Sequence, residues 1–170
     1  MTNILITAPP RSGKTTLINE LLSTLSKYCI GMITNEIRQG GVRKGFQIES
    51  LSGSTFILAS KKNFSSRYRV SNYGVYVENL GKIVKILEKE IEEKEPEIII
   101  IDEIGKMELC SSSFKIFLEK CLDTKKVLGT IMLRDTEYSK KIKERKDTEV
   151  FLLTKDNREM IKNKIIMRLN

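Results

Sequence analysis

Apolar residues fall into two patterns that predict alternating strands and helices. Short continuous apolar runs, typical of strands covered on both faces, occupy residues 3–7, 29–34, 98–101, 127–133 and 150–153. Apolar residues at helical spacing occupy residues 17–25, 80–91, 114–122 and 161–169. Together they predict an α/β fold, a three-layer αβα sandwich on a mostly parallel sheet. We expect one domain over residues 1–170, because no linker interrupts the pattern.

The pattern is least regular between the second strand and the second helix. Glycines follow residue 39, and residues 46–51 and 55–59 predict two short strands around a Ser-Gly turn. Residues 60–72 form a polar, basic segment with no clear periodicity. Further along, Pro96 is expected to end a helix, and Asp135 is expected to cap the helix that follows it.

A candidate phosphate-binding loop lies between the first strand and the first helix. Its sequence, Ala-Pro-Pro-Arg-Ser-Gly-Lys-Thr, has the strand and helix context of a P-loop. Backbone N–H groups at a helix N-terminus favour phosphate, Lys14 is suited to the β- and γ-phosphates, and the Thr15 hydroxyl is suited to Mg²⁺. We expect the nucleotide phosphates to contact Ala8, Pro9, Pro10, Arg11, Ser12, Gly13, Lys14 and Thr15. Ala8 replaces the first glycine of the pattern, which requires that this residue keep a negative φ.

A second group of candidate residues follows the isoleucine strand, in the sequence Asp102-Glu103-Ile104-Gly105. In open α/β sheets, ligands bind beyond the carboxyl ends of the strands. We therefore expect this segment beside the candidate phosphate loop, with Asp102 on the Mg²⁺ side and Glu103 as the base that orients and deprotonates water. A solvated acidic turn is the alternative. By the same topology, Asn157 and Arg158 are expected near the base or sugar, unless they only cap the last helix.

Composition narrows the function classes. The chain has no histidine, which excludes Ser-His-Asp and Cys-His catalysis, and its three cysteines have no metal-ligand spacing. The net charge is +8, which raises the question of nucleic-acid binding, but the basic residues are mixed with glutamates along the chain. A nucleotide is itself an anion that a positive site attracts. The start of the chain has no signal-peptide pattern and no apolar run reaches membrane length, so we expect a cytoplasmic protein without membrane contact.

Four segments resemble the thermophilic nucleoside-triphosphate phosphatase family, which includes a human cancer-related nucleoside triphosphatase. They are residues 8–15, the Thr-x-Glu-x-Arg-x-Gly-Gly-x-Arg-x-Gly-Phe pattern of residues 34–46, residues 102–109 and residues 157–158. The resemblance implies a P-loop NTPase with a RecA-type core. It implies slow, Mg²⁺-dependent hydrolysis of ATP, GTP, CTP and UTP to diphosphates, with broad base preference. Residues 60–77 match the family poorly.

The second of these segments carries two arginines with permanently charged, forked donors suited to phosphate oxygens. Arg38 or Arg43 is a candidate arginine finger supplied by the same chain, and solvated surface arginines are the alternative. Lys106 and Glu108 either pair with each other or face the γ-phosphate.

Two other functions stay open at this stage. A nucleotide or nucleoside kinase would share the loop and the layers, with Arg67 and Arg69 as its only lid candidates, although Glu103 favours water as the nucleophile. A nucleic-acid-linked ATPase is suggested by the basic segments 61–69 and 140–146, which are more typical of solvated surface. We expect a monomer whose ligands are nucleoside triphosphates.

Overall fold

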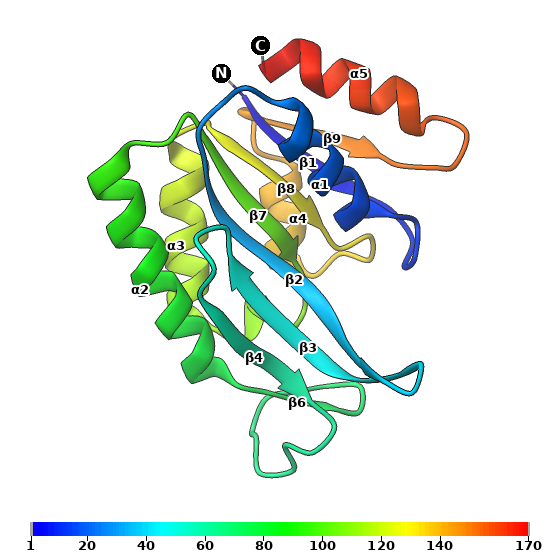
Figure 1. Cartoon of the computed structure of the whole chain (residues 1–170), viewed down its shortest axis with the longest axis vertical. Helices are drawn as coiled ribbons and strands as arrows, with labels where there is room; N and C mark the ends of the chain where they lie inside the picture. Colours follow the sequence, from blue (N-terminus) through cyan, green and yellow to red (C-terminus); the bar gives the residue numbers. More distant parts are fainter. Residues whose placement is uncertain (1, 170) are drawn as a thin grey trace.

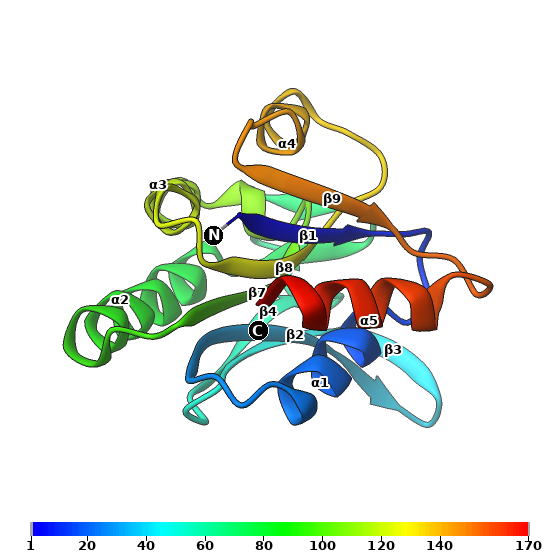
Figure 2. The ribbon, with the colours of Figure 1, turned by 90° about the horizontal axis from the view of Figure 1, so that it is seen from above.

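A nine-stranded sheet runs through the computed structural model, which describes residues 2–169, and helices cover both of its faces (Figures 1 and 2). The strand order is β5-β6-β4-β3-β2-β7-β8-β1-β9. The strands are β1 (Asn3–Thr7), β2 (Cys29–Gln39), β3 (Val42–Ser50), β4 (Thr55–Ser60), β5 (Arg69–Val70), β6 (Tyr73–Val75), β7 (Ile98–Ile104), β8 (Val127–Ile131) and β9 (Thr148–Leu152). The helices are α1 (Lys14–Thr24), α2 (Val77–Lys94), α3 (Ser112–Asp123), α4 (Glu137–Lys143) and α5 (Arg158–Leu169), with a short 3₁₀ turn at Glu108–Cys110.

The parallel part of the sheet contains β2, β7, β8, β1 and β9. In β7, Ile98 and Ile100 pack in the core with α1 and α5, whereas Ile99 and Ile101 pack in the core with α2 and α3. All four are at most 1% exposed, and full burial of such a side chain contributes about 1.5–3 kcal/mol. This alternation explains the uninterrupted isoleucine run and confirms that the strand is covered on both faces. The expected α/β fold with two helical layers is confirmed.

The other half of the sheet is antiparallel. The two short strands expected at residues 46–51 and 55–59 are present in it as β3 and β4, whereas β5 and β6 were not predicted. We call β3, β4, β6 and β5 the arm; they extend the sheet from β2 through antiparallel pairs (Figure 1). The strand expected at 29–34 continues to Gln39 and turns into β3 through Gly40 and Gly41, whose φ values of 56° and 75° are those of a tight hairpin. The sheet is therefore mixed, and the arm stands beside the carboxyl end of β7.

One helix cap differs from the sequence prediction. Thr136, not Asp135, caps α4: its hydroxyl accepts from the Ser139 N–H, and the Ser139 hydroxyl accepts from the Thr136 N–H. Asp135 instead pairs with Lys143 at 2.6 Å. The next residue along, Thr136, has the extended backbone that an N-cap needs. Pro96 follows the end of α2 as expected.

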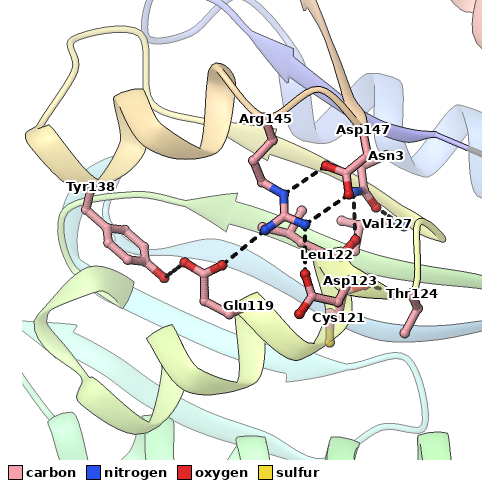
Figure 3. A network of polar contacts seen from close by, with 10 residues as sticks. All are labelled: Asn3, Glu119, Cys121, Leu122, Asp123, Thr124, Val127, Tyr138, Arg145 and Asp147. Atoms are coloured by element: carbon pink, nitrogen blue, oxygen red, sulfur yellow. Dashed lines mark hydrogen bonds and ion pairs between the residues drawn. The ribbon is translucent and has the colours of Figure 1, made fainter.

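A polar network joins elements at the amino ends of β1 and β8, opposite the candidate phosphate loop (Figure 3). Arg145 pairs with Asp147, which directly precedes β9, and with Glu119 and Asp123 of α3, at 2.8–3.3 Å. Asn3 donates to the Leu122 carbonyl and accepts from the Val127 N–H. These contacts fix α3 and the connection to β9 against the central strands. Within residues 2–169, no helix is long and apolar enough to cross a membrane.

Candidate active site

The candidate phosphate loop connects the buried end of β1 to the first turn of α1. Ala8 is 1% exposed and is not among the residues with positive φ, so the condition for alanine at this position is met. Two later residues do take left-handed backbone, Gly13 with φ 78° and Arg11 with φ 63°. For a residue with a Cβ this conformation costs roughly 1–2 kcal/mol. The backbone at Arg11 is therefore strained, because only glycine adopts such a φ without this cost.

The loop lies against a cavity of about 750 Å³ at the carboxyl edge of the sheet. Lys14 donates from Nζ to the Ala8 carbonyl at 3.3 Å, across the loop. The end of β7, the turn that follows it and the arm also contribute residues to the cavity wall. Its lining is Pro10, Arg11, Ser12, Gly13, Lys14, Thr15, Thr16, Thr34, Glu36, Arg43, Phe46, Val70, Glu103, Gly105, Lys106, Met107 and Glu108.

Asp102 directly precedes Glu103; it is 1% exposed and is not among the residues that line the cavity. Its Oδ1 accepts from the Thr130 hydroxyl at the end of β8, while its Oδ2 is buried without a hydrogen-bond partner in the described structure. Burial raises the pKa of Asp102, opposed by the hydrogen bond from Thr130, by the nearby Thr15 hydroxyl and by the charge of Lys14. A buried, unpartnered carboxylate oxygen is costly, and a bound cation would satisfy it.

Thr15 and Asp102 are thus the residues that could hold a metal ion. Among residues 2–169, no group of three or more Asp, Glu, Cys or His side chains could form a metal site by itself. This donor set matches a Mg²⁺ ion, which binds proteins through one or two oxygen groups and completes its shell with phosphates and water.

Glu103 follows Asp102 through a cis peptide bond and lines the cavity. Burial raises the pKa of Glu103, the charge of Lys14 opposes this, and the neighbouring Asp102 adds to it. A carboxylate whose pKa is raised toward neutrality is a better proton acceptor than an exposed one.

A second carboxyl group, Glu108, is buried on the same side of the cavity. It is 3% exposed and accepts from the Thr34 hydroxyl at 3.1 Å. Burial raises the pKa of Glu108 to about 8, with a further contribution from Glu103. Gly105 lies between the two carboxyl groups, since a Cβ there would come within 2.9 Å of Glu108 Oε2. Lys106 also lines the cavity, and no ion pair joins it to Glu108 in the described residues.

The structure distinguishes the two candidate arginines. Glu36 holds both: Oε2 pairs with Arg38 at 2.6 Å and Oε1 pairs with Arg43 at 2.9 Å. Burial alone would raise the pKa of Glu36, but the two arginines outweigh it and lower that pKa. Arg43 lines the cavity, whereas Arg38 does not and donates to the Gly41 carbonyl at the hairpin tip.

The two residues expected near the base lie behind the candidate phosphate loop and do not line the cavity. Arg158 donates to the Gly13 carbonyl at 3.2 Å and pairs with Glu20 of α1 at 2.7 Å. The side-chain oxygen of Asn157 accepts from the Thr154 N–H at 2.7 Å, and the backbone carbonyl of Asn157 accepts from the Ile161 N–H in α5. Both residues support the loops at this edge.

Three residues of the site were not singled out from the sequence. Thr130 contacts Asp102, Glu36 holds the arginines, and Tyr73 accepts from Arg43 at 3.0 Å. Thr130 lay inside the strand predicted over residues 127–133, and only the observed end of β8 at Ile131 places it at the edge that carries the site. Tyr73 had no signal in the sequence, since it comes from the arm.

The fold and the site together define an α/β enzyme with an anion-binding loop beside two buried acidic residues. The chain belongs to the NTPase family, whose family model matches residues 3–166. It is similar to "Nucleoside-triphosphatase THEP1" of Thermotoga sp. (strain RQ2), at 44% identity over 96% of this chain and 92% of the relative, and to that of Natranaerobius thermophilus, at 36% over 98% and 96%.

Solved structures give the same result. The crystal structure of THEP1 from Aquifex aeolicus is 34% identical, with a TM-score of 0.85 over 100% of this chain and 99% of its own. The solution structure of a human cancer-related nucleoside triphosphatase is 30% identical, with a TM-score of 0.79 over 100% and 98%. The family resemblance drawn from the sequence is confirmed.

Proposed function

We propose that the chain hydrolyses nucleoside triphosphates to diphosphates and phosphate in a Mg²⁺-dependent reaction, slowly and with broad base preference. The observation that carries the proposal is one cavity lined by both the candidate phosphate loop and Glu103, whose chain neighbour Asp102 has a buried, unpartnered oxygen. The names of the relatives support triphosphates as substrates. In this proposal the whole chain is one P-loop NTPase domain with a RecA-type core.

Each group then has a defined part. Backbone N–H groups of residues 12–15 and Lys14 bind the phosphates, and Lys14 leaves the Ala8 carbonyl to do so. Thr15 and Asp102 would hold Mg²⁺, which would supply positive charge to offset that of the phosphates. Glu103 orients the attacking water and takes its proton.

Arg43 is the proposed arginine finger, because it reaches the cavity and Arg38 does not. A finger of this kind supplies about 10³-fold or more in rate. Contacts of Ala8, Pro9, Ile104 and Gly105 with the nucleotide, of Asn157 and Arg158 with its nucleoside, a monomeric state and a cytoplasmic location stay predictions.

The alternative of a kinase is tested together with the proposal. Phosphate release from ATP, GTP, CTP and UTP is measured with Mg²⁺, with and without nucleoside acceptors and single-stranded nucleic acid. Hydrolysis without any addition supports the proposal, strict acceptor dependence favours the kinase, and salt-sensitive stimulation favours the nucleic-acid-linked ATPase.

The matched variants are Lys14→Ala and Lys164→Ala, the second an exposed lysine on α5. We expect Lys14→Ala to fold normally by circular dichroism and to lose most triphosphate turnover, and Lys164→Ala to match the parent. Full hydrolysis by a folded Lys14→Ala protein would contradict the assignment of the loop.

A further inference from the structure

Arg43 is held in place by an unusually complete set of contacts for an arginine on a hairpin. Its Nε donates to the Tyr73 hydroxyl at 3.0 Å and its Nη1 donates to Glu36 at 2.9 Å. The guanidinium carbon lies 5.2 Å from the ring centre of Phe46 and 5.6 Å from that of Tyr73. These contacts use two of the three guanidinium nitrogens and leave Nη2 outside them.

The ring and the hydroxyl of Tyr73 have separable parts in this arrangement. Tyr73 is 6% exposed, and its ring meets Phe46 edge to face at a centroid distance of 5.2 Å. The ring therefore packs as part of the core, as a phenylalanine would. Among the described residues, the hydroxyl makes one side-chain hydrogen bond, which it accepts from Arg43 Nε.

Fixing the arginine before the reaction has a physical advantage. A free arginine side chain loses rotamer freedom when it is ordered, and groups that stabilise a transition state act best when they are oriented in advance. Arg43 reaches the cavity from β3, and Tyr73 supports it from β6, which pairs with β4 and β5 within the arm.

We propose that Tyr73 and Glu36 are positioning residues, which orient Arg43 so that its third nitrogen is presented to the phosphate in the cavity. The inference rests on the proposed function, since it takes Arg43 as the arginine finger. It gives the arm a role in turnover, because the hydroxyl that orients the arginine belongs to β6.

The test compares Tyr73→Phe with Tyr28→Phe, which removes an exposed tyrosine hydroxyl near the start of β2. We expect Tyr73→Phe to lower kcat for ATP about tenfold or more, the loss typical of a hydrogen bond to a charged group. KM should change little, since an interaction made in the transition state affects kcat. Tyr28→Phe should match the parent, and both proteins should show the parental circular dichroism spectrum.

A double-mutant comparison separates positioning from general support of the fold. If the hydroxyl acts through Arg43, then adding Tyr73→Phe to Arg43→Ala causes no further loss of kcat. Guanidinium ion added to Arg43→Ala should restore part of the activity only while Tyr73 keeps its hydroxyl. Losses that multiply in the double variant, or a Tyr73→Phe protein with parental kcat, would overturn the inference.

The two failures are distinguishable. If Arg43→Ala hydrolyses ATP normally, the arginine finger of the proposed function is wrong and the inference falls with it. If Arg43→Ala is impaired while Tyr73→Phe is not, the proposed function stands and only the positioning role fails.

Discussion

Glu108 is a buried carboxyl group whose ionisation should limit stability at alkaline pH. Because burial raises its pKa from 4.5 to about 8, the folded protein binds this proton more tightly than the unfolded chain does. The stabilising contribution is full below pH 4.5, decreases as the pH rises from 4.5 toward 8, and is lost above 8. Glu108→Gln replaces the group by a neutral side chain of the same shape, which removes this dependence.

The magnitude follows from the same linkage. One pKa unit corresponds to about 1.36 kcal/mol, so a change from 4.5 to about 8 sets an upper bound of about 5 kcal/mol. Local relaxation and entry of water reduce the cost of a buried charge. We therefore expect Glu108→Gln to equal the parent near pH 5 and to exceed its free energy of unfolding by about 2–4 kcal/mol at pH 9.

The assay is urea unfolding of both proteins, followed by circular dichroism at intervals from pH 5 to pH 9. Glu137→Gln is the matched control, because its side chain is 86% exposed and Lys141 lowers the pKa of Glu137. For that variant the difference from the parent should be small and of opposite sign. A Glu108→Gln protein that gains no stability between pH 5 and pH 9 would refute the reasoning.

Three further predictions concern other residues of the structure. Glu103→Gln should still bind Mg²⁺-nucleotide while kcat falls about 10²- to 10⁴-fold. Asp102→Asn should lower kcat and also raise the Mg²⁺ concentration needed for half-maximal rate. If the two variants give the same Mg²⁺ titration, the two carboxylates do not have separate roles. Arg158→Ala should raise KM for all four triphosphates alike, because Arg158 supports the Gly13 carbonyl; a change confined to one base would instead place it at the nucleoside. Arg145→Met should lower the free energy of unfolding by about 1–2 kcal/mol with kcat unchanged, and a loss of activity at parental stability would argue against a purely structural network.

The sequence patterns predicted the parallel half of the fold well, because its strands are buried on both faces and its helices have one apolar stripe. In the arm they predicted β3 and β4 but missed the extension of β2 to Gln39 and the strands β5 and β6. The strand that pairs with β2 on the side away from β7 depends on the length of the β2–β3 hairpin. The strands β5 and β6 contain only two and three residues. Such short strands have too few positions to show a period.

The candidate site divides in the same way. Lys14, Thr15 and Glu103 were predictable, because each follows directly from its place after a strand or at a helix start. The burial of Glu108 was not, since it depends on the 3₁₀ turn that folds it back toward Thr34. The choice between Arg38 and Arg43 was also out of reach, because the two residues are cross-strand partners in one hairpin and bind the same carboxylate, and only Arg43 lines the cavity.

The position of β1 in the sheet has a consequence for synthesis of the protein. β1 pairs only with β8 and β9, so Ile4 meets partners at Leu128 and Glu149. On the ribosome, β1 therefore has no strand partner until β8 and β9, in the last third of the chain, have emerged. Such long-range pairing forms slowly. A nascent chain should acquire nucleotide affinity only after β8 and β9 have emerged, and until then its first apolar segment stays exposed to chaperones.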